Sequence, residues 1–291
     1  MKTYFSPAKL NLFFRVLSKR RDGYHEIASL FTAINFGDTL TISKSDKDSF
    51  TILGMENLPA DAKNLVIKAL ILFRDTVEKT DPVAIILSKK IPIESGLGGG
   101  SSNAATTLWA LNELYNYPLS LEELCSLAST IGSDVPFFLS NGLAYCQGRG
   151  EIVENIKENI SLPLWLIHRE GLCASTPSVY NECEPNEVSK EDPKVLLKRM
   201  LEGDPLFIND LEKAAFRLVP KLGEVKQALQ RTFEEVTLTG SGSAFFGYGL
   251  KENMIAEGIA VTMLRRSENS WYYEVDRPTS LLIDSTSRSL M

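Results

Sequence analysis

The chain carries, between residues 92 and 105, the stretch Pro92-Ile93-Glu94-Ser95-Gly96-Leu97-Gly98-Gly99-Gly100-Ser101-Ser102-Asn103-Ala104-Ala105. It joins a strand-like apolar run (83–87) to a helix-like, alanine-rich run (104–114). Four glycines in the five positions 96–100 let the backbone approach a ligand closely. Residues 101–103 are favourable N-cap residues, so we expect the helix to begin after them. Because a helix start with free N–H groups binds anions, the stretch predicts a phosphate-binding loop.

Other glycine motifs with known chemistry do not match this loop. A Walker A loop needs a lysine directly after its last glycine, and none follows Gly100. A dinucleotide fingerprint of the form Gly-x-Gly-x-x-Gly fails, because its last position falls on Ser101 or Asn103. The His-Arg-Asp and Asp-Phe-Gly segments of protein kinases do not occur. A flexible turn that binds no ligand remains the alternative for the loop taken alone.

The composition indicates a globular protein of one large or two ordinary domains. Its 291 residues are 44% hydrophobic, and the net charge of −6 argues against a nucleic-acid or membrane-surface role. The N-terminus has no signal-peptide pattern, and no apolar run is long enough to span a membrane. The cysteines form no Cys-x-x-Cys pair, which favours reduced thiols in a cytoplasmic protein. With two histidines in the chain, a His/Cys zinc site is not expected.

The order of the expected elements indicates an α+β protein rather than a strictly alternating α/β sheet. The first strand spans 3–17, and a second, 27–42, is interrupted at 35–38. We place a domain boundary near residue 155, which divides the chain into parts 1–155 and 156–276. A final helix is expected near 252–264 and a final strand near 271–275, and residues 277–291 form a Ser/Thr-rich loose tail.

Three separated segments together resemble the GHMP small-molecule kinases. They are Ser6-Pro7-Ala8-Lys9-Leu10-Asn11-Leu12, the glycine loop, and Leu238-Thr239-Gly240-Ser241-Gly242-Ser243-Ala244. The resemblance implies two parts, an N-terminal one like ribosomal protein S5 domain 2 and a C-terminal ferredoxin-like one, with the active site in the cleft between them. It also implies ATP as phosphate donor, with Mg²⁺ and a small-molecule alcohol as acceptor. The third motif, centred on Gly240, Ser241 and Gly242, would close against the glycine loop, although a role in packing alone stays open.

Two charged residues match the family's catalytic positions. Asp134 lies in Gly132-Ser133-Asp134-Val135-Pro136-Phe137, where the family's aspartate follows a helix and precedes a strand, and it is the candidate base. Lys9 is its candidate partner, because a lysine within an apolar strand is costly to bury unpaired. Without the resemblance, a loop aspartate with no chemistry and a solvated lysine would be the simpler interpretations.

The first motif and the glycine loop, taken together with Arg21-Asp22-Gly23-Tyr24-His25 and the segment around Asp134, resemble one group within the family. Members of that group phosphorylate the 2-hydroxyl of a cytidine-diphosphate-linked methylerythritol in non-mevalonate isoprenoid biosynthesis. The resemblance implies that Tyr24, His25 and Tyr180 bind the cytosine, that Asn11 contacts the methylerythritol, and that Arg149 holds the diphosphate. Core packing remains the alternative for the aromatic residues. A homoserine or mevalonate type of kinase is the nearest other enzyme, and a nucleotide-binding regulator without catalysis is the alternative from another class. Protein ligands of Mg²⁺ are not assigned, although Ser102 is a candidate.

Overall fold

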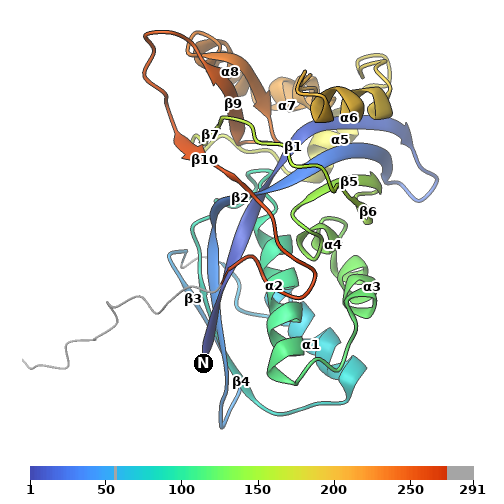
Figure 1. Cartoon of the computed structure of the whole chain (residues 1–291), viewed down its shortest axis with the longest axis vertical. Coiled ribbons are helices and arrows are strands. Elements are labelled where there is room, and N and C mark those ends of the chain that lie inside the picture. The colour runs from blue at the N-terminus through green and yellow to red at the C-terminus, as the bar shows by residue number, and fades with distance from the viewer. Residues whose placement is uncertain (56–57, 274–291) are drawn as a thin grey trace, which may run out of the picture.

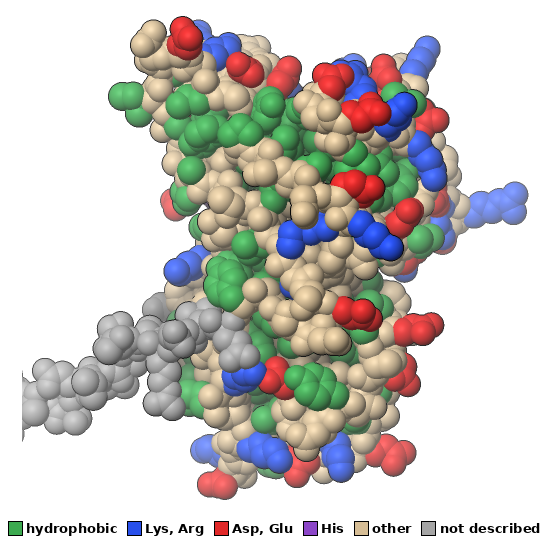
Figure 2. Space-filling view, viewed as in Figure 1, with side chains coloured by type: hydrophobic (Ala, Val, Ile, Leu, Met, Phe, Trp, Pro, Cys, Tyr) green, Lys and Arg blue, Asp and Glu red, His purple; other side chains and the backbone are tan. Residues whose placement is uncertain are grey.

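The computed structural model describes residues 1–55 and 58–273, which form two β-sheets with helices packed on them (Figure 1). This arrangement confirms the expected α+β class. None of the helices in these described ranges has the length and apolar character needed to cross a bilayer. Acidic and basic side chains are interspersed over the face shown in Figure 2.

The larger sheet is organised by the long strand β2 (His25–Lys44). Strand β1 (Lys2–Lys19) pairs with it antiparallel from end to end. The expected interruption at 35–38 is wrong, since β2 continues through it. Pro7 pairs with Gly37 but Ala8 pairs with Ile34, so residues 35–36 form a β-bulge within one continuous strand. The other strands of this sheet are β3 (Ser49–Leu53), β4 (Val83–Ser88), β5 (Leu143–Gly148), β6 (Ile152–Asn155) and β11 (Met263–Leu264).

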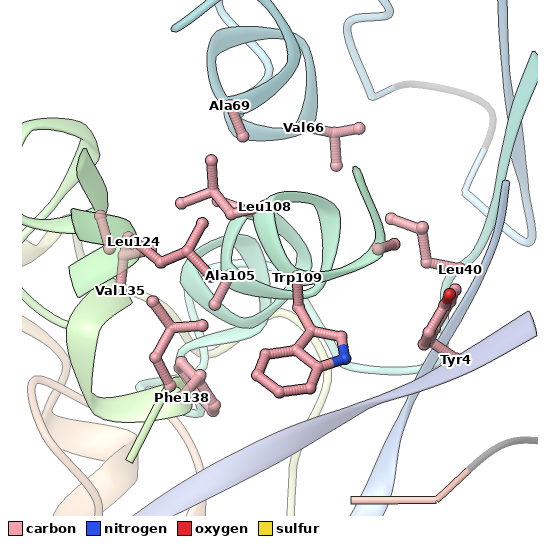
Figure 3. Packing of buried hydrophobic residues seen from close by; sticks show 14 of the residues in the cluster. Tyr4, Leu40, Val66, Ala69, Ala105, Leu108, Trp109, Leu124, Val135 and Phe138 are labelled. Atoms are coloured by element: carbon pink, nitrogen blue, oxygen red, sulfur yellow. The ribbon is translucent and has the colours of Figure 1, made fainter. Parts of the chain in front are cut away.

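Four helices cover one part of this sheet. They are α1 (Leu65–Val77), α2 (Gly99–Leu114), α3 (Leu121–Ile131) and α4 (Val135–Phe138). Helix α2 is buried on almost all sides: its Ala105, Leu108 and Trp109 face a core that also takes in Leu40 of β2 and Val66 of α1 (Figure 3). Because α2 directly follows the glycine loop, this core fixes the position of the loop's C-terminal end.

The smaller sheet has the strand order β10-β7-β9-β8, formed by β7 (Leu164–Ile167), β8 (Phe233–Leu238), β9 (Phe245–Leu250) and β10 (Ile259–Val261). Its region also contains α5 (Thr176–Glu182), α6 (Pro193–Leu201), α7 (Glu212–Leu218) and α8 (Pro220–Leu229). After β10 the chain returns to the larger sheet, where β11 pairs with β2. The division of the chain near residue 155, just after β6, stays a prediction.

The expected C-terminal elements are wrong where the structure describes them. Residues 252–264 form a turn followed by β10 and β11 instead of a helix, and residues 271–273 are not a strand. β10 pairs with β7 and β11 with β2, so the pairing partners are distant in sequence and leave no local signal. Residues 274–275 and the expected tail at 277–291 lie outside the described residues.

Candidate active site

The glycine loop leads directly from β4 to α2. The loop ends at Gly98, which lies beside the side chain of Lys9 and is the N-cap of α2. Its backbone is in the left-handed conformation with φ +69°. The expectation that residues 101–103 cap the helix is wrong, because α2 begins at Gly99 and these residues lie inside the helix. Among the described residues no side chain caps the N-terminus of α2. Its first N–H groups are therefore open to an anion, as the phosphate-loop interpretation requires.

The first motif, residues 6–12, places a buried lysine beside this loop. Lys9 on β1 is 3% exposed, and its backbone N–H donates to the carbonyl of Leu97 at 3.0 Å. Its ammonium donates to Oδ1 of Asn11 at 2.6 Å and lies 3.5 Å from Oδ2 of Asp134. It also lies 4.5 Å from the centre of the Phe31 ring. Burial of an unpaired ammonium would be unfavourable, and these partners compensate for it and fix the position of the charge.

Asp134 is the more exposed member of this ion pair, with 31% of its side chain accessible. It precedes α4, so the expected strand after it is wrong. Val135 and Phe137 are fully buried, and so is Phe138 (Figure 3), so this short run is apolar in every direction. Such a run fits a buried strand and a buried helix equally well, and the sequence pattern cannot separate them. Asp134 thus combines contact with a buried cation and access to solvent.

The third motif lies directly against the glycine loop. A Cβ atom added to Gly96 would lie 2.0 Å from the carbonyl oxygen of Thr239, and Ala244 donates its N–H to the carbonyl of Ser95 at 3.0 Å. The hydroxyl of Thr239 donates to Oδ1 of Asn11 at 3.2 Å and accepts from the Asn11 backbone N–H at 3.0 Å. The structure therefore joins the three motifs. Thr239, which sequence reasoning did not single out, makes the link.

The residues expected to bind cytosine form an aromatic group in the same site. The rings of His25 and Tyr180 are stacked, with centroids 5.1 Å apart and planes 25° apart. Tyr24 is exposed, and the guanidinium of Arg149 lies 5.1 Å from the centre of its ring. Helix α5 carries Tyr180, and its Thr176 shares a hydrogen bond of 2.9 Å with Ser241 of the third motif.

Burial and neighbouring charges shift the pKa values of His25, the first residue of β2, and of Asp22 in the turn before it. Partial burial, aided by the charge of Lys19, lowers the pKa of His25 and favours its neutral ring. Hydrogen bonds from Arg20 lower the pKa of Asp22, whose carboxylate also accepts the N–H of Tyr24 at 3.1 Å. This contact shapes the turn that presents Tyr24 and His25 to the site.

One cavity of about 840 Å³ is lined by residues of the glycine loop, the Lys9–Asp134 pair and the aromatic group. Most of the expected residues line it: Lys9, Tyr24, His25, Pro92, Ile93, Glu94, Ser95, Gly96, Gly98, Gly99, Gly100, Ser101, Asp134, Arg149, Tyr180, Gly240 and Ser241. Four of them do not, namely Asn11, Leu97, Ser102 and Gly242. The hydroxyl of Ser102 is fully buried and lies 2.9 Å from the hydroxyl of Ser6.

Sequence reasoning also missed residues at the loop's two ends. Lys89 and Asn103 line the cavity and contact the buried Asp38. One available signal was the alternation of Asp38, Leu40 and Ile42 on β2, which places a carboxylate on the face that is otherwise apolar. The cavity lining also includes Asn64 and Leu65 from the start of α1.

Comparison with known proteins gives consistent results. A sequence model described as the GHMP kinases N terminal domain matches residues 64–142. A 4-diphosphocytidyl-2-C-methyl-D-erythritol kinase from Protochlamydia amoebophila is 41% identical over 280 residues, covering 94% of each chain. The chloroplastic kinase of the same name from Oryza sativa subsp. japonica is 40% identical over 93% of this chain and 72% of the relative.

Solved structures agree with these sequence matches. A crystal structure of 4-(cytidine 5'-diphospho)-2C-methyl-D-erythritol kinase has a TM-score of 0.71 at 36% identity, covering 84% of this chain and 89% of that chain. A homoserine kinase from Cytophaga hutchinsonii has a TM-score of 0.66 at 22% identity, covering 86% of this chain and 85% of that chain, which shows a shared fold.

Proposed function

Because this chain belongs to the family of 4-diphosphocytidyl-2-C-methyl-D-erythritol kinases, a branch of the GHMP kinases, we propose that it phosphorylates that family's substrate. The reaction transfers the terminal phosphate of ATP to the 2-hydroxyl of 4-diphosphocytidyl-2-C-methyl-D-erythritol. The products are the 2-phosphate and ADP, in the non-mevalonate pathway of isoprenoid biosynthesis. The observation that carries the proposal is a single cavity holding the glycine loop, the Lys9–Asp134 pair and the His25–Tyr180 ring pair.

Asp134 is proposed as the base. The oxygen of the acceptor hydroxyl forms a bond to the terminal phosphorus while the bond between that phosphorus and ADP breaks, and the hydroxyl proton passes to Asp134. A carboxylate is a weak base for an alcohol, so the proton moves late in a loose transition state that needs little nucleophilic strength. Lys9 supports this role, because its ammonium lies 3.5 Å from the carboxylate and can orient the hydroxyl.

Binding is divided between two parts of the cavity. The loop from Pro92 to Ser102 and the N-terminus of α2 would hold the ATP phosphates, with the third motif closing against them. The aromatic residues Tyr24, His25 and Tyr180 would hold the cytosine by stacking and hydrogen bonding. Arg149 would bind the substrate diphosphate. Asn11 is fully buried and does not line the cavity, so its contribution would be to orient Lys9. Contact with the methylerythritol would require the Asn11 side chain to become exposed to the cavity.

We further propose that Mg²⁺ accompanies ATP. Mg²⁺ is commonly held by one or two carboxylates together with nucleotide phosphates and water, and it neutralises charge on the phosphates. The cavity fits this pattern, since Glu94 and Asp134 are carboxylates in its lining. Within residues 1–55 and 58–273 no group of three or more His, Cys, Asp and Glu side chains could hold a metal. Ser102 would have to exchange its contact with Ser6 before it could act as a ligand.

The test is ADP release by the purified protein with Mg·ATP and 4-diphosphocytidyl-2-C-methyl-D-erythritol, compared with homoserine and mevalonate. We expect turnover with the cytidyl substrate alone. The Asp134→Asn variant should lose about 100-fold or more in kcat while still binding ATP. Turnover with homoserine or mevalonate instead would refute the proposed acceptor. ATP binding without turnover of any acceptor would favour the regulator, and near-normal kcat in Asp134→Asn would remove the aspartate from the role of base.

A further inference from the structure

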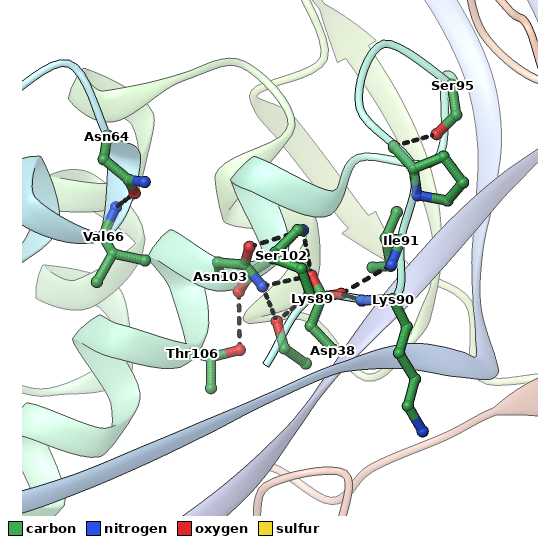
Figure 4. A network of polar contacts seen from close by, with 12 residues as sticks. Asp38, Asn64, Val66, Lys89, Lys90, Ile91, Ser95, Ser102, Asn103 and Thr106 are labelled. Carbon is green, nitrogen blue, oxygen red and sulfur yellow. Dashed lines mark hydrogen bonds and ion pairs between the residues drawn. The ribbon is translucent and has the colours of Figure 1, made fainter. Parts of the chain in front are cut away.

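One fully buried carboxylate binds both ends of the glycine loop. Oδ1 of Asp38 accepts the backbone N–H groups of Lys90 at 2.7 Å and Ile91 at 2.8 Å, directly before the loop. Oδ2 accepts from the ammonium of Lys89 and from the side-chain amide of Asn103, the latter at 2.9 Å, directly after the loop (Figure 4). Residues on either side of the loop are thus joined through one side chain.

The placement of Asp38 follows from the sheet. Thr39 pairs with Ser88, so the next residues outward, Asp38 and Lys89, lie side by side where β2 and β4 end their pairing. Asp38 shares the face of β2 with Leu40, which packs beneath the helices. Gly37 beside it has no room for a side chain, since an added Cβ would lie 2.4 Å from the carbonyl oxygen of Ser6. The bulge and this close contact between β1 and β2 direct the carboxylate at the start of α2.

Further hydrogen bonds connect Asp38 to α2 and to β1. The amide of Asn103 also donates to the hydroxyl of Ser6 at 2.9 Å, and its oxygen accepts from Lys89 at 3.1 Å. Ser6 in turn shares a hydrogen bond with Ser102 at 2.9 Å. The charges of Asp38 and Lys89 balance, so the pair adds little net field to the cavity. Its effect is geometric, because each polar atom fixes a segment of the loop's frame.

We propose that Asp38 is a positioning residue for ATP, one that sets the distance between the strand end and the helix start across which the phosphate loop is stretched. This inference rests on the proposed function, in which that loop holds the ATP phosphates. Asp38 does not itself line the cavity, and it acts through Ile91, Lys89 and Asn103. A loop whose ends separate loses the convergence of its N–H groups on one anion.

The test uses Asp38→Asn, a substitution of nearly the same shape. The variant keeps an oxygen that accepts from the N–H groups of Lys90 and Ile91. It presents an NH₂ group to the ammonium of Lys89 and the amide of Asn103, so the hydrogen bond to the start of α2 is lost. Affinity is measured by calorimetric titration with Mg²⁺ and the non-hydrolysable analogue AMPPNP, without acceptor. We expect the Kd to rise by about tenfold or more. The KM for the cytidyl substrate, whose cytosine would be held by the aromatic group, should change less than twofold.

Matched controls separate positioning from stability. Asn112→Ala removes a buried amide from the same helix α2, where it bonds the backbone of Leu119 far from the loop, and should leave the Kd unchanged. A milder pair applies if Asp38→Asn does not fold. Ser6→Ala should raise the Kd severalfold, whereas Thr3→Ala, which removes a similar hydroxyl pair with Thr41 on the same strand, should not.

Each result is decisive. An unchanged Kd in a folded Asp38→Asn, or in Ser6→Ala if the first variant is unfolded, overturns the inference. An equal loss of AMPPNP affinity in the Asn112→Ala control also overturns it. So does an equal rise in the Kd for AMPPNP and the KM for the cytidyl substrate in Asp38→Asn, because either result indicates a general structural role. The titration needs no turnover, so a wild-type protein that binds AMPPNP but does not phosphorylate the cytidyl substrate would refute the proposed function and leave the positioning role testable.

Discussion

Replacing Gly96 by alanine is expected to disrupt the site where the glycine loop and the third motif meet. Gly96 has φ +77°, a conformation that costs an L-residue about 1–2 kcal/mol. The added Cβ would also lie 2.0 Å from the carbonyl oxygen of Thr239, whereas ordinary contact begins at 3.4 Å. The obstacle is backbone on both sides, so no side-chain rotation relieves it. The two loops must separate by about 1.4 Å, the difference between these distances.

This separation would be transmitted to Lys9. Thr239 holds Asn11 through two hydrogen bonds, and Asn11 accepts the hydrogen bond of Lys9. A displacement of about 1 Å in a catalytic site can cost about 100-fold in rate. We therefore expect kcat/KM of Gly96→Ala to fall by about 100-fold or more, through both ATP binding and the Lys9–Asp134 geometry.

The assay is steady-state ADP release, with thermal unfolding of the same samples. Gly100→Ala is the matched control for stability: it lies inside α2, and its added Cβ would meet Leu65 at an ordinary 3.4 Å. Alanine should stabilise that position by about 0.5–1 kcal/mol. The reasoning is refuted if Gly96→Ala keeps wild-type kcat/KM, or if the two variants have the same unfolding midpoint.

Three further outcomes are expected. Tyr180→Ala should weaken binding of the cytidyl substrate by about 1–3 kcal/mol through lost stacking, with the KM for ATP unchanged. Asp210→Asn should lower the free energy of unfolding in urea by about 3 kcal/mol or more, because it leaves the buried guanidinium of Arg15 without its 2.8 Å carboxylate partner. Burial and Lys19 lower the pKa of His25 below 6.5, so the unfolded chain binds more protons just below that pH. Stability should therefore fall as the pH drops from 6.5 through the lowered pKa, and His25→Asn should reduce this loss.

Controls for these outcomes are available in the chain. Tyr180→Phe keeps the ring and should bind the cytidyl substrate normally, so a large loss there would contradict stacking as the cause. Glu224→Gln removes the exposed partner of Lys221 and should change stability by less than about 1 kcal/mol. If urea titrations of His25→Asn and wild type depend identically on pH between 5 and 7, His25 does not carry the proposed linkage.

Prediction from the sequence succeeded where local signals were strong. The glycine loop between β4 and α2 was placed by its glycines and the flanking patterns, and the family was identified from three short motifs. Phosphate binding by this loop stays a prediction. It failed at the start of α2 because Gly98 in the left-handed conformation caps the helix, in place of the polar residues that usually do so. It failed at 252–264 because β10 and β11 are held by strands far away in the chain.

The sequence by itself determined the residue types: glycines that allow a backbone to approach phosphate, a lysine in an apolar strand, and aromatic rings in a polar turn. Their meeting was decided by the tertiary structure alone. Lys9 and Asp134 are 125 positions apart, and Gly96 and Thr239 are 143 apart. No local preference encodes such distances. These residues come together because the buried β1–β2 pair and α2 pack in one arrangement. The same arrangement directs Asp38 toward both ends of the loop.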